Sequence, residues 1–222
     1  MACFAPKFIT FDCYGTLIYF EMAPVARALY ADRVAPEAMD RFIADFSSFR
    51  LDEVLGAWKP YKDVVANALQ RTCKLNGVAY RDSDTDAVYA AVPTWGPHPD
   101  VPEALARVAK EFPIVGLTNS MVDLIPPSIE KIGGPFHAVI TAEETGAYKP
   151  QMKGFEYMLD KLGARPEEVM HCSSSFRYDL MTAHDMHFGA RVFVNRGHEP
   201  SNPKYSTHEI ADIRGLPGLL SL

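Results

Sequence analysis

Several signals that would assign the chain to a familiar class are missing. The 222 residues contain no apolar run long enough to cross a bilayer, and no basic segment followed by an apolar one opens the sequence. The net charge of −6 argues against a polyanionic partner. No Gly-x-Gly-x-x-Gly nucleotide fingerprint follows an apolar strand. We therefore expect a cytoplasmic protein with no nucleic-acid and no membrane partner.

The cysteines and histidines lack metal-ligand spacing. The four cysteines are scattered: Cys3, Cys13, Cys73 and Cys172. Cys13 and Cys172 lie in or beside apolar strand patterns, which favours reduced thiols over a disulfide framework. A reactive Cys13 is the alternative, although no histidine is near it in sequence. His184 and His187 could share a helix face, but no further ligand is in frame, so we expect a solvated helix end, no metal and no cofactor.

Short apolar segments recur along the chain and predict strands. They span residues 8–11, 114–117, 138–141, 169–172 and 192–194. Most of the intervening segments have helical periodicity, for example 101–112 and 155–162. This alternation is typical of an α/β fold with a doubly wound, Rossmann-like parallel sheet.

One stretch interrupts the alternation. Residues 18–95 show no convincing strand pattern, but they show helical patterns at 23–33, 36–49, 63–75 and 84–92. An all-helical insert after the first strand predicts a separate cap over the carboxyl edge of the sheet. We expect an α/β core domain at 1–17 and 96–222 and a helical cap subdomain at 18–95, which 222 residues are enough to build.

Polar residues follow four of the predicted strands at their carboxyl ends, where parallel α/β sheets place their ligands. They are Asp12, Tyr14, Thr16, Thr118, Asn119, Ser120, Lys149, Ser174, Tyr178 and Asp179. Ser120 could also cap a following helix. Asp12 alone is either a turn residue or a nucleophilic carboxylate, and local features leave both open.

The combination of motifs is more specific than its parts. FDCYGTL at 11–17, YKP at 148–150 and the serine-rich segment ending in Asp179 resemble the haloacid dehalogenase superfamily, and most closely its 2-haloacid dehalogenase branch. The resemblance covers the whole chain. It implies that Asp12 attacks C2 of a small anionic 2-substituted carboxylic acid, most specifically an (S)-2-haloacid. Water activated by Asp179 would then hydrolyse the aspartyl ester to a 2-hydroxy acid.

Two substitutions set the chain apart from phosphatases of this superfamily. Phosphatases carry Asp-x-Asp, whose second acid protonates an alkoxide, whereas here that position is Tyr14, a residue type with a reference pKa of about 10. Their fourth motif pairs two acids, whereas here Ser174 takes the first position and Asp179 the second. A halide needs no proton donor, and a neutral carbon needs no Mg²⁺ to offset repulsion. The resemblance thus implies metal independence.

The resemblance also implies roles for the neighbouring residues. Lys149 should pair with Asp12 and keep it ionised, with a purely structural ion pair as the alternative. Hydrogen bonds to Asp12, the substrate carboxylate or the ester are expected from Thr16, Thr118, Asn119 and Ser174. Further substrate contacts are expected from Tyr14, Ser120, Phe176 and Tyr178, and from Tyr61 and Trp58 on the cap.

A small anionic substrate calls for an arginine on the cap, because a guanidinium matches a carboxylate. Arg50 begins a segment that resembles the family's arginine followed by a Glu-containing stretch, whereas Arg41 better matches the distance from the nucleophile. We favour Arg50 and keep Arg41 as the alternative.

Two departures from the dehalogenase pattern leave alternatives open. Phe176 stands where the dehalogenases have Asn, and Phe155 stands where they have Tyr. The alternatives are hydrolysis of another C2-substituted acid, such as ring opening of a strained cyclic amino acid, a Mg²⁺-dependent phosphatase, and a binding scaffold without activity. Together, Asp12, Lys149 and Asp179 argue against a scaffold. A homodimer is one option for the assembly.

Overall fold

The chain forms two compact units in a computed structural model that describes residues 4–222. The first unit comprises the residues up to Tyr19 together with Gly96–Leu222, and the second comprises Phe20–Trp95. Each is described by itself below. That the predicted core and the predicted cap are separate domains stays a prediction.

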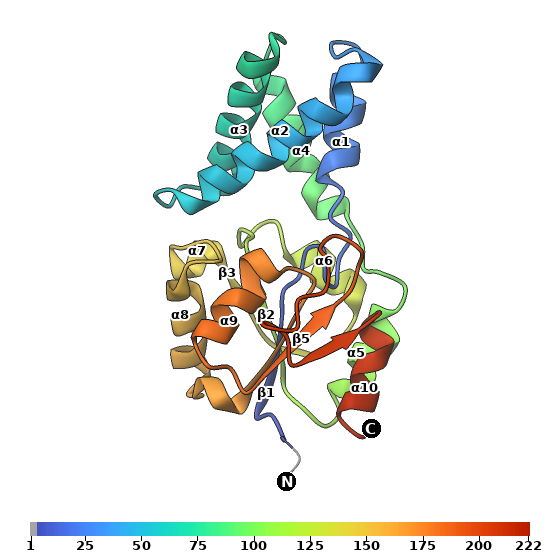
Figure 1. Cartoon of the computed structure of the whole chain (residues 1–222), viewed down its shortest axis with the longest axis vertical. Helices are drawn as coiled ribbons and strands as arrows, with labels where there is room; N and C mark the ends of the chain where they lie inside the picture. The colour runs from blue at the N-terminus through green and yellow to red at the C-terminus, as the bar shows by residue number, and fades with distance from the viewer. Residues whose placement is uncertain (1–3) are drawn as a thin grey trace. The chain divides into compact units, whose positions relative to one another are not determined.

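The first unit is built on a six-stranded parallel sheet (Figure 1). Its strands are β1 (Phe8–Phe11), β2 (Ile114–Thr118), β3 (Phe136–Thr141), β4 (Val169–Ser173), β5 (Ala190–Val194) and β6 (His208–Ile210). All neighbours pair in parallel, in the order β3-β2-β1-β4-β5-β6. The doubly wound fold class is confirmed, and the chain direction across the sheet switches between β1 and β4, where such folds place their ligands.

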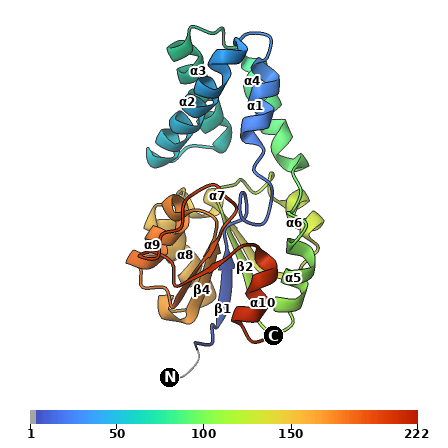
Figure 2. The same ribbon diagram turned by 45° about the vertical axis from the view of Figure 1, so that its right-hand side comes forward.

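Helices cover both faces of this sheet (Figure 2). On one face lie α7 (Ala142–Thr145), α8 (Met152–Leu162) and α9 (Met181–Asp185), and on the other lie α5 (Val101–Val108) and α10 (Leu216–Leu219). After β2, α6 spans Pro126–Ile132. The helix predicted at 101–112 ends earlier than expected, and the one predicted at 155–162 begins earlier.

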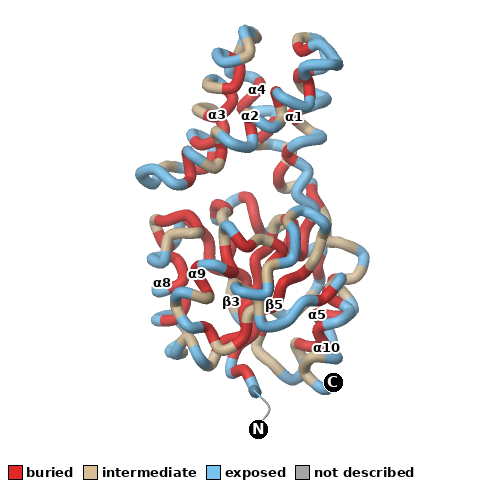
Figure 3. Tube along the Cα trace, viewed as in Figure 1, coloured by how far each residue is buried: buried red, intermediate tan, exposed pale blue. Residues whose placement is uncertain are grey.

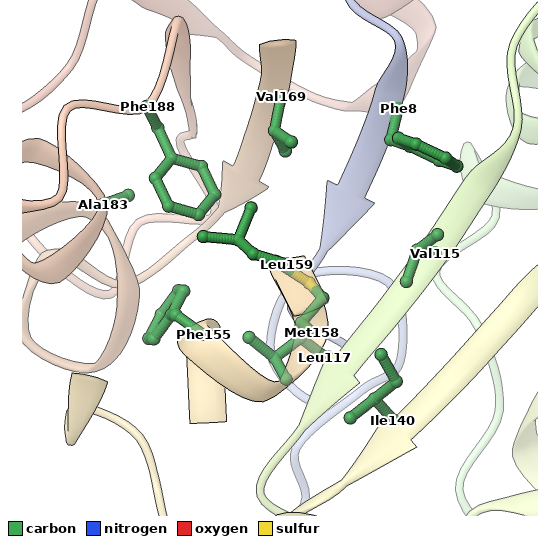
Figure 4. Packing of buried hydrophobic residues seen from close by; sticks show 10 residues of the cluster. All are labelled: Phe8, Val115, Leu117, Ile140, Phe155, Met158, Leu159, Val169, Ala183 and Phe188. Carbon is green, nitrogen blue, oxygen red and sulfur yellow. The ribbon is translucent and has the colours of Figure 1, made fainter. Parts of the chain in front are cut away.

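The central strands are buried along their whole length (Figure 3). The apolar side chains of α8 recur at three- and four-residue spacing, which places Phe155, Met158 and Leu159 on one face of the helix. They pack with side chains of the sheet and of α9 (Figure 4); the cluster is Phe8, Val115, Leu117, Ile140, Phe155, Met158, Leu159, Val169, Ala183 and Phe188. Burying one such large side chain stabilises the fold by about 1.5–3 kcal/mol. This packing fixes the strand ends that carry the polar residues.

The second unit consists of helices. They are α1 (Met22–Tyr30), α2 (Pro36–Leu55), α3 (Tyr61–Asn76) and α4 (Asp82–Ala91), followed by the short turn η1 (Val92–Thr94). All four predicted helices are present, with α2 running further than expected. Asp84 joins α4 to α1 because it accepts hydrogen bonds from the Tyr30 hydroxyl at 2.9 Å and from two nitrogens of Arg33 at 2.8 and 2.9 Å.

Candidate active site

Asp12 follows β1 and enters a tight turn. Its backbone N–H donates to the Cys172 carbonyl of β4 at 3.1 Å, which extends the strand pairing by one residue. Gly15 then adopts a φ of +94°, which L side chains rarely tolerate. The turn brings Thr16 back, so that its hydroxyl donates to Asp12 Oδ2 at 2.7 Å.

Lys149 bonds to residues from three parts of the sheet edge. Its ammonium donates to Asp12 Oδ1 at 2.8 Å, to Asp179 Oδ1 at 2.7 Å and to the Leu117 carbonyl at 2.8 Å. A lysine ammonium has three protons, so all of them are used. Three residues predicted from widely separated motifs, Asp12, Lys149 and Asp179, are thus brought together in one bonded cluster.

Asn119 fixes the position of that lysine. Its Oδ1 accepts from the Lys149 backbone N–H at 2.7 Å, and its Nδ2 donates to the Lys149 carbonyl at 3.0 Å. The amide therefore holds the Lys149 backbone from both sides. A direct contact of Asn119 with the substrate or the ester stays a prediction.

Asp179 lies in a π-helical turn, η3 (Phe176–Leu180), and is fully buried. In addition to its bond from Lys149, Asp179 has two other partners. Its Oδ1 lies 3.0 Å from His171 Nε2, and its Oδ2 accepts from the Ser173 hydroxyl at 3.1 Å. Neither His171 nor Ser173 was predicted. The sequence did hold a signal for them, because His171 and Ser173 are polar residues at alternating positions of the apolar strand β4, just before Asp179.

The charges of the cluster are unequally stabilised. Burial raises the pKa of Asp12, and Lys149 and Thr16 offset this only in part. Burial also acts to raise the pKa of Asp179, but Lys149 and His171 outweigh it and hold that pKa below its usual range. Desolvation opposes the charge on Lys149, yet the two carboxylates raise its pKa overall.

Exposure distinguishes the two carboxylates further. The exposed fraction of the side chain is 12% for Asp12, 3% for Lys149 and 0% for Asp179. Asp12 is therefore both the less stabilised anion and the one that reaches toward solvent. A nucleophile must be reached by the substrate, and of the two buried carboxylates only Asp12 has any exposed surface.

Ser174 lies against the turn that carries Asp12. Its backbone N–H donates to the Thr16 hydroxyl oxygen at 2.8 Å, and its own hydroxyl oxygen lies 3.1 Å from the same atom. Ser174 thus contacts Asp12 through Thr16, and its direct role in the reaction stays a prediction.

Two hydroxyls, those of Thr118 and Ser120, are buried at the carboxyl end of β2. In the described part of the chain neither oxygen has a nitrogen or oxygen partner within hydrogen-bond distance, and the Thr118 hydroxyl bonds only to the Cys13 thiol, where it acts to lower the thiol's pKa. An unsatisfied buried polar group costs about 1–3 kcal/mol. Ser120 does not cap the next helix, because α6 begins at Pro126 after Ile125. That expectation is wrong, and both hydroxyls remain candidates for substrate contact.

The aromatic candidates of the first unit occupy different settings. Tyr14 and Tyr178 are partly buried, in the turn after β1 and in η3. Phe176 instead packs on Phe193, with ring centroids 4.4 Å apart, and on Leu180. The Phe176 ring is therefore part of the hydrophobic core. A contact between this ring and the substrate stays a prediction.

The remaining candidates belong to the second unit, and their part in the site stays a prediction. Arg50 is buried with 8% exposure, and its guanidinium lies over the rings of Phe20 at 4.9 Å and Phe46 at 5.4 Å. Its Nε has no hydrogen-bond partner among residues 4–222. The Arg41 side chain is 76% exposed and lies 3.9 Å from Asp45. Of the aromatics of this unit, Tyr61 is buried and Trp58 is exposed.

Other sequence expectations concern metals and membranes. Among the described residues, no three His, Cys, Asp or Glu side chains are grouped as metal ligands. No helix there is long and apolar enough to span a bilayer. Metal independence stays a prediction that needs a measurement.

The cysteines of the described chain are buried and unpaired. They are Cys13, Cys73 and Cys172, and Cys3 lies outside the described residues. Burial, and to a smaller extent the neighbouring Asp12, raises the pKa of the Cys13 thiol to about 12. Cys13 is therefore a poor thiolate near neutral pH.

We expect iodoacetamide to leave Cys13 unmodified in the native protein between about pH 7 and 9, because thiolate and access are both lacking. Peptide mass spectrometry of native and denatured samples measures this, with the denatured protein as the positive control. Native modification at pH 8 with loss of activity would favour the reactive-thiol alternative.

Comparison with known proteins places the chain in a family. Residues 6–187 match the model of the haloacid dehalogenase-like hydrolases. The chain is 27% identical over 195 residues to the (S)-2-haloacid dehalogenase H-109 of Pseudomonas putida, covering 85% of each chain. It is 24% identical over 217 residues to (S)-2-haloacid dehalogenase 1 of Pseudomonas sp. strain CBS-3, covering 95% of this chain and 94% of that one.

Solved structures share the fold. The L-2-haloacid dehalogenase of Xanthobacter autotrophicus with chloropropionic acid covalently bound has a TM-score of 0.78 at 21% identity, covering 98% of this chain and 99% of that one. A superfamily hydrolase of Bacillus subtilis bound to magnesium has a TM-score of 0.83 at 15% identity, covering 98% of this chain and 99% of that one. The fold is thus shared by a dehalogenase and by a hydrolase solved with magnesium, and it does not by itself decide which reaction this chain catalyses.

The family match assigns the chain to the hydrolases, and the solved structures confirm the Rossmann-like core. The chain belongs to the haloacid dehalogenase-like hydrolases, since that family's model matches residues 6–187 of its 222. The similarity to 2-haloacid dehalogenases, expected from the motifs, is confirmed.

Proposed function

We propose that the protein hydrolyses a small 2-haloacid of (S) configuration to a 2-hydroxy acid through a covalent ester on Asp12. The observation that carries the proposal is the bonded cluster Asp12, Lys149 and Asp179, in which Asp12 is the partly exposed carboxylate. The similarity to several (S)-2-haloacid dehalogenases supports the choice of substrate.

In the first step the Asp12 carboxylate attacks C2 of the substrate. A bond forms between an Asp12 oxygen and C2, the carbon–halogen bond breaks, and the halide leaves with the bonding electrons. Attack from the side opposite the halogen inverts C2. Lys149 keeps Asp12 ionised for this attack, because a nearby positive charge favours the carboxylate form.

In the second step water attacks the ester carbonyl carbon of Asp12. Asp179 takes a proton from the water as the new carbon–oxygen bond forms. The tetrahedral intermediate then collapses, the bond from the carbonyl carbon to the substrate oxygen breaks, and that oxygen receives the proton. Asp12 is released as its acid and loses a proton to solvent, so the sum is haloacid plus water giving hydroxy acid, halide and H⁺.

The residue at position 14 fits this leaving group. A halide is the anion of a strong acid and departs without a proton, so no acid is needed two residues after the nucleophile. Tyr14 occupies the position where the superfamily's phosphatases need a carboxylic acid. An amine leaving group, as in ring opening of a cyclic amino acid, would need a donor that the three-residue cluster does not supply.

A panel of short 2-chloro and 2-bromo acids tests the proposal, with halide release measured in the presence and absence of EDTA. We expect the (S) enantiomers to be turned over with rates unchanged by the chelator, because the attacked carbon carries no charge to be offset. Loss of activity with EDTA and its rescue by Mg²⁺, together with hydrolysis of p-nitrophenyl phosphate, would assign the chain to the phosphatases instead.

A further inference from the structure

One buried histidine takes no part in the chemistry proposed above. His171 lies in the middle of β4 with an exposed fraction of 0%. Its ring packs edge-on against Phe155 and Phe188, with centroids 5.6 and 6.1 Å away. Burying a polar ring in such apolar surroundings lowers the stability of the fold unless its nitrogens are hydrogen-bonded.

Both nitrogens of this ring have partners. Nδ1 lies 2.7 Å from the Thr10 hydroxyl, and Nε2 lies 3.0 Å from Asp179 Oδ1. Thr10 and His171 are register partners of β1 and β4, so the sheet itself places them side by side. An ionised Asp179 can only accept, which puts the proton of a neutral ring on Nε2 and makes Nδ1 the acceptor for the Thr10 hydroxyl.

The bonds to Asp179 can now be counted atom by atom. Oδ1 accepts from Lys149 Nζ and from His171 Nε2, which uses both of its lone pairs. Oδ2 accepts from the Ser173 hydroxyl and keeps one lone pair. We propose that His171 is a positioning residue that saturates Oδ1 and so directs Asp179 to take the proton of the attacking water on Oδ2.

This inference rests on the proposed function, and it assigns His171 to one step of it. Asp12 is held by Lys149 and Thr16, whereas His171 bonds to Asp179 and Thr10. Without the histidine bond, Oδ1 regains a free lone pair and the carboxylate loses one of its anchors. Ester formation should then proceed and ester hydrolysis should slow.

The test is a rapid-quench experiment with (S)-2-chloropropionate on the full chain, in which intact-protein mass reports the Asp12 ester. In His171→Leu we expect ester formation within twofold of the wild-type rate, ester hydrolysis slowed at least tenfold, and accumulation of the ester. His171→Gln, which restores an N–H donor, should recover most of the hydrolysis rate. The control His137→Leu replaces an exposed strand histidine and should show no accumulation.

For folded His171→Leu, either of two results would overturn the inference: ester hydrolysis at the wild-type rate, or an equal loss of ester formation and ester hydrolysis.

If His171→Leu does not fold, Thr10→Val takes its place, since it removes the hydroxyl that holds Nδ1. No ester accumulation in that variant would overturn the inference as well. In each of these cases the wild type still forms the ester, so the proposed function stands. A wild type that forms no ester with any 2-haloacid would instead refute the proposed function, and this inference with it.

Discussion

Replacing Asp12 with asparagine is expected to abolish halide release from a 2-haloacid while leaving the fold intact. The amide is nearly isosteric with the carboxylate but is not a competent nucleophile, so we expect turnover to fall by about 10⁴-fold or more. Halide release and a thermal melt measure the two parts of the prediction. Burial raises the pKa of Asp12, so the carboxylate is held at a cost, and its loss should not lower the melting temperature appreciably.

The matched control is Asp160→Asn, which changes an exposed carboxylate on α8 in the same unit. It should keep wild-type activity. Substantial activity in Asp12→Asn, once deamidation is ruled out by mass, would contradict the nucleophile assignment. A single turnover of the wild type in ¹⁸O-water should place the isotope in Asp12, and label found directly in the first hydroxy acid would mean that water attacks the substrate.

The cluster at the sheet edge was predictable because each of its members is fixed by backbone geometry. Asp12 and Asp179 follow neighbouring strands β1 and β4, and Lys149 follows β3. Parallel strands bring their carboxyl ends to one edge, so residues far apart in sequence had to meet there. The use of all three ammonium protons by Lys149 was not predictable, since it depends on side-chain conformation.

Other parts of the site and fold depend on tertiary contacts that leave little trace in sequence. His171 lies in a strand that resembles an ordinary apolar one, and only its pairing with β1 and the turn η3 gives it partners. The strand β6 has three residues, two of them exposed, so it lacks the apolar run that marks the other strands. Arg196, not predicted either, donates to the Thr16 carbonyl and pairs with Asp100 at 2.9 Å, contacts between residues 180 and 96 positions apart in sequence.

The arginine proposed to bind the substrate's carboxylate is the second residue whose replacement should have a large effect. A small anion enclosed in a protein must be paired, because an unpaired buried charge is very costly. In the core cluster, the ammonium of Lys149 is already committed to two carboxylates and a carbonyl. Arg50 is a suitable donor since it is buried, lies over the rings of Phe20 and Phe46, and has an Nε without a partner in the described chain.

We therefore expect Arg50→Lys to lower kcat/KM by about 30- to 150-fold, the equivalent of about 2–3 kcal/mol, because an ammonium keeps the charge but loses the planar fork and the stacking. The matched variant Arg41→Lys should change it less than about twofold, since an exposed ion pair such as that with Asp45 contributes little. The reverse pattern would transfer the role to Arg41. If neither variant has an effect, the substrate's acid group is held elsewhere, with the buried hydroxyls of Thr118 and Ser120 as the next candidates.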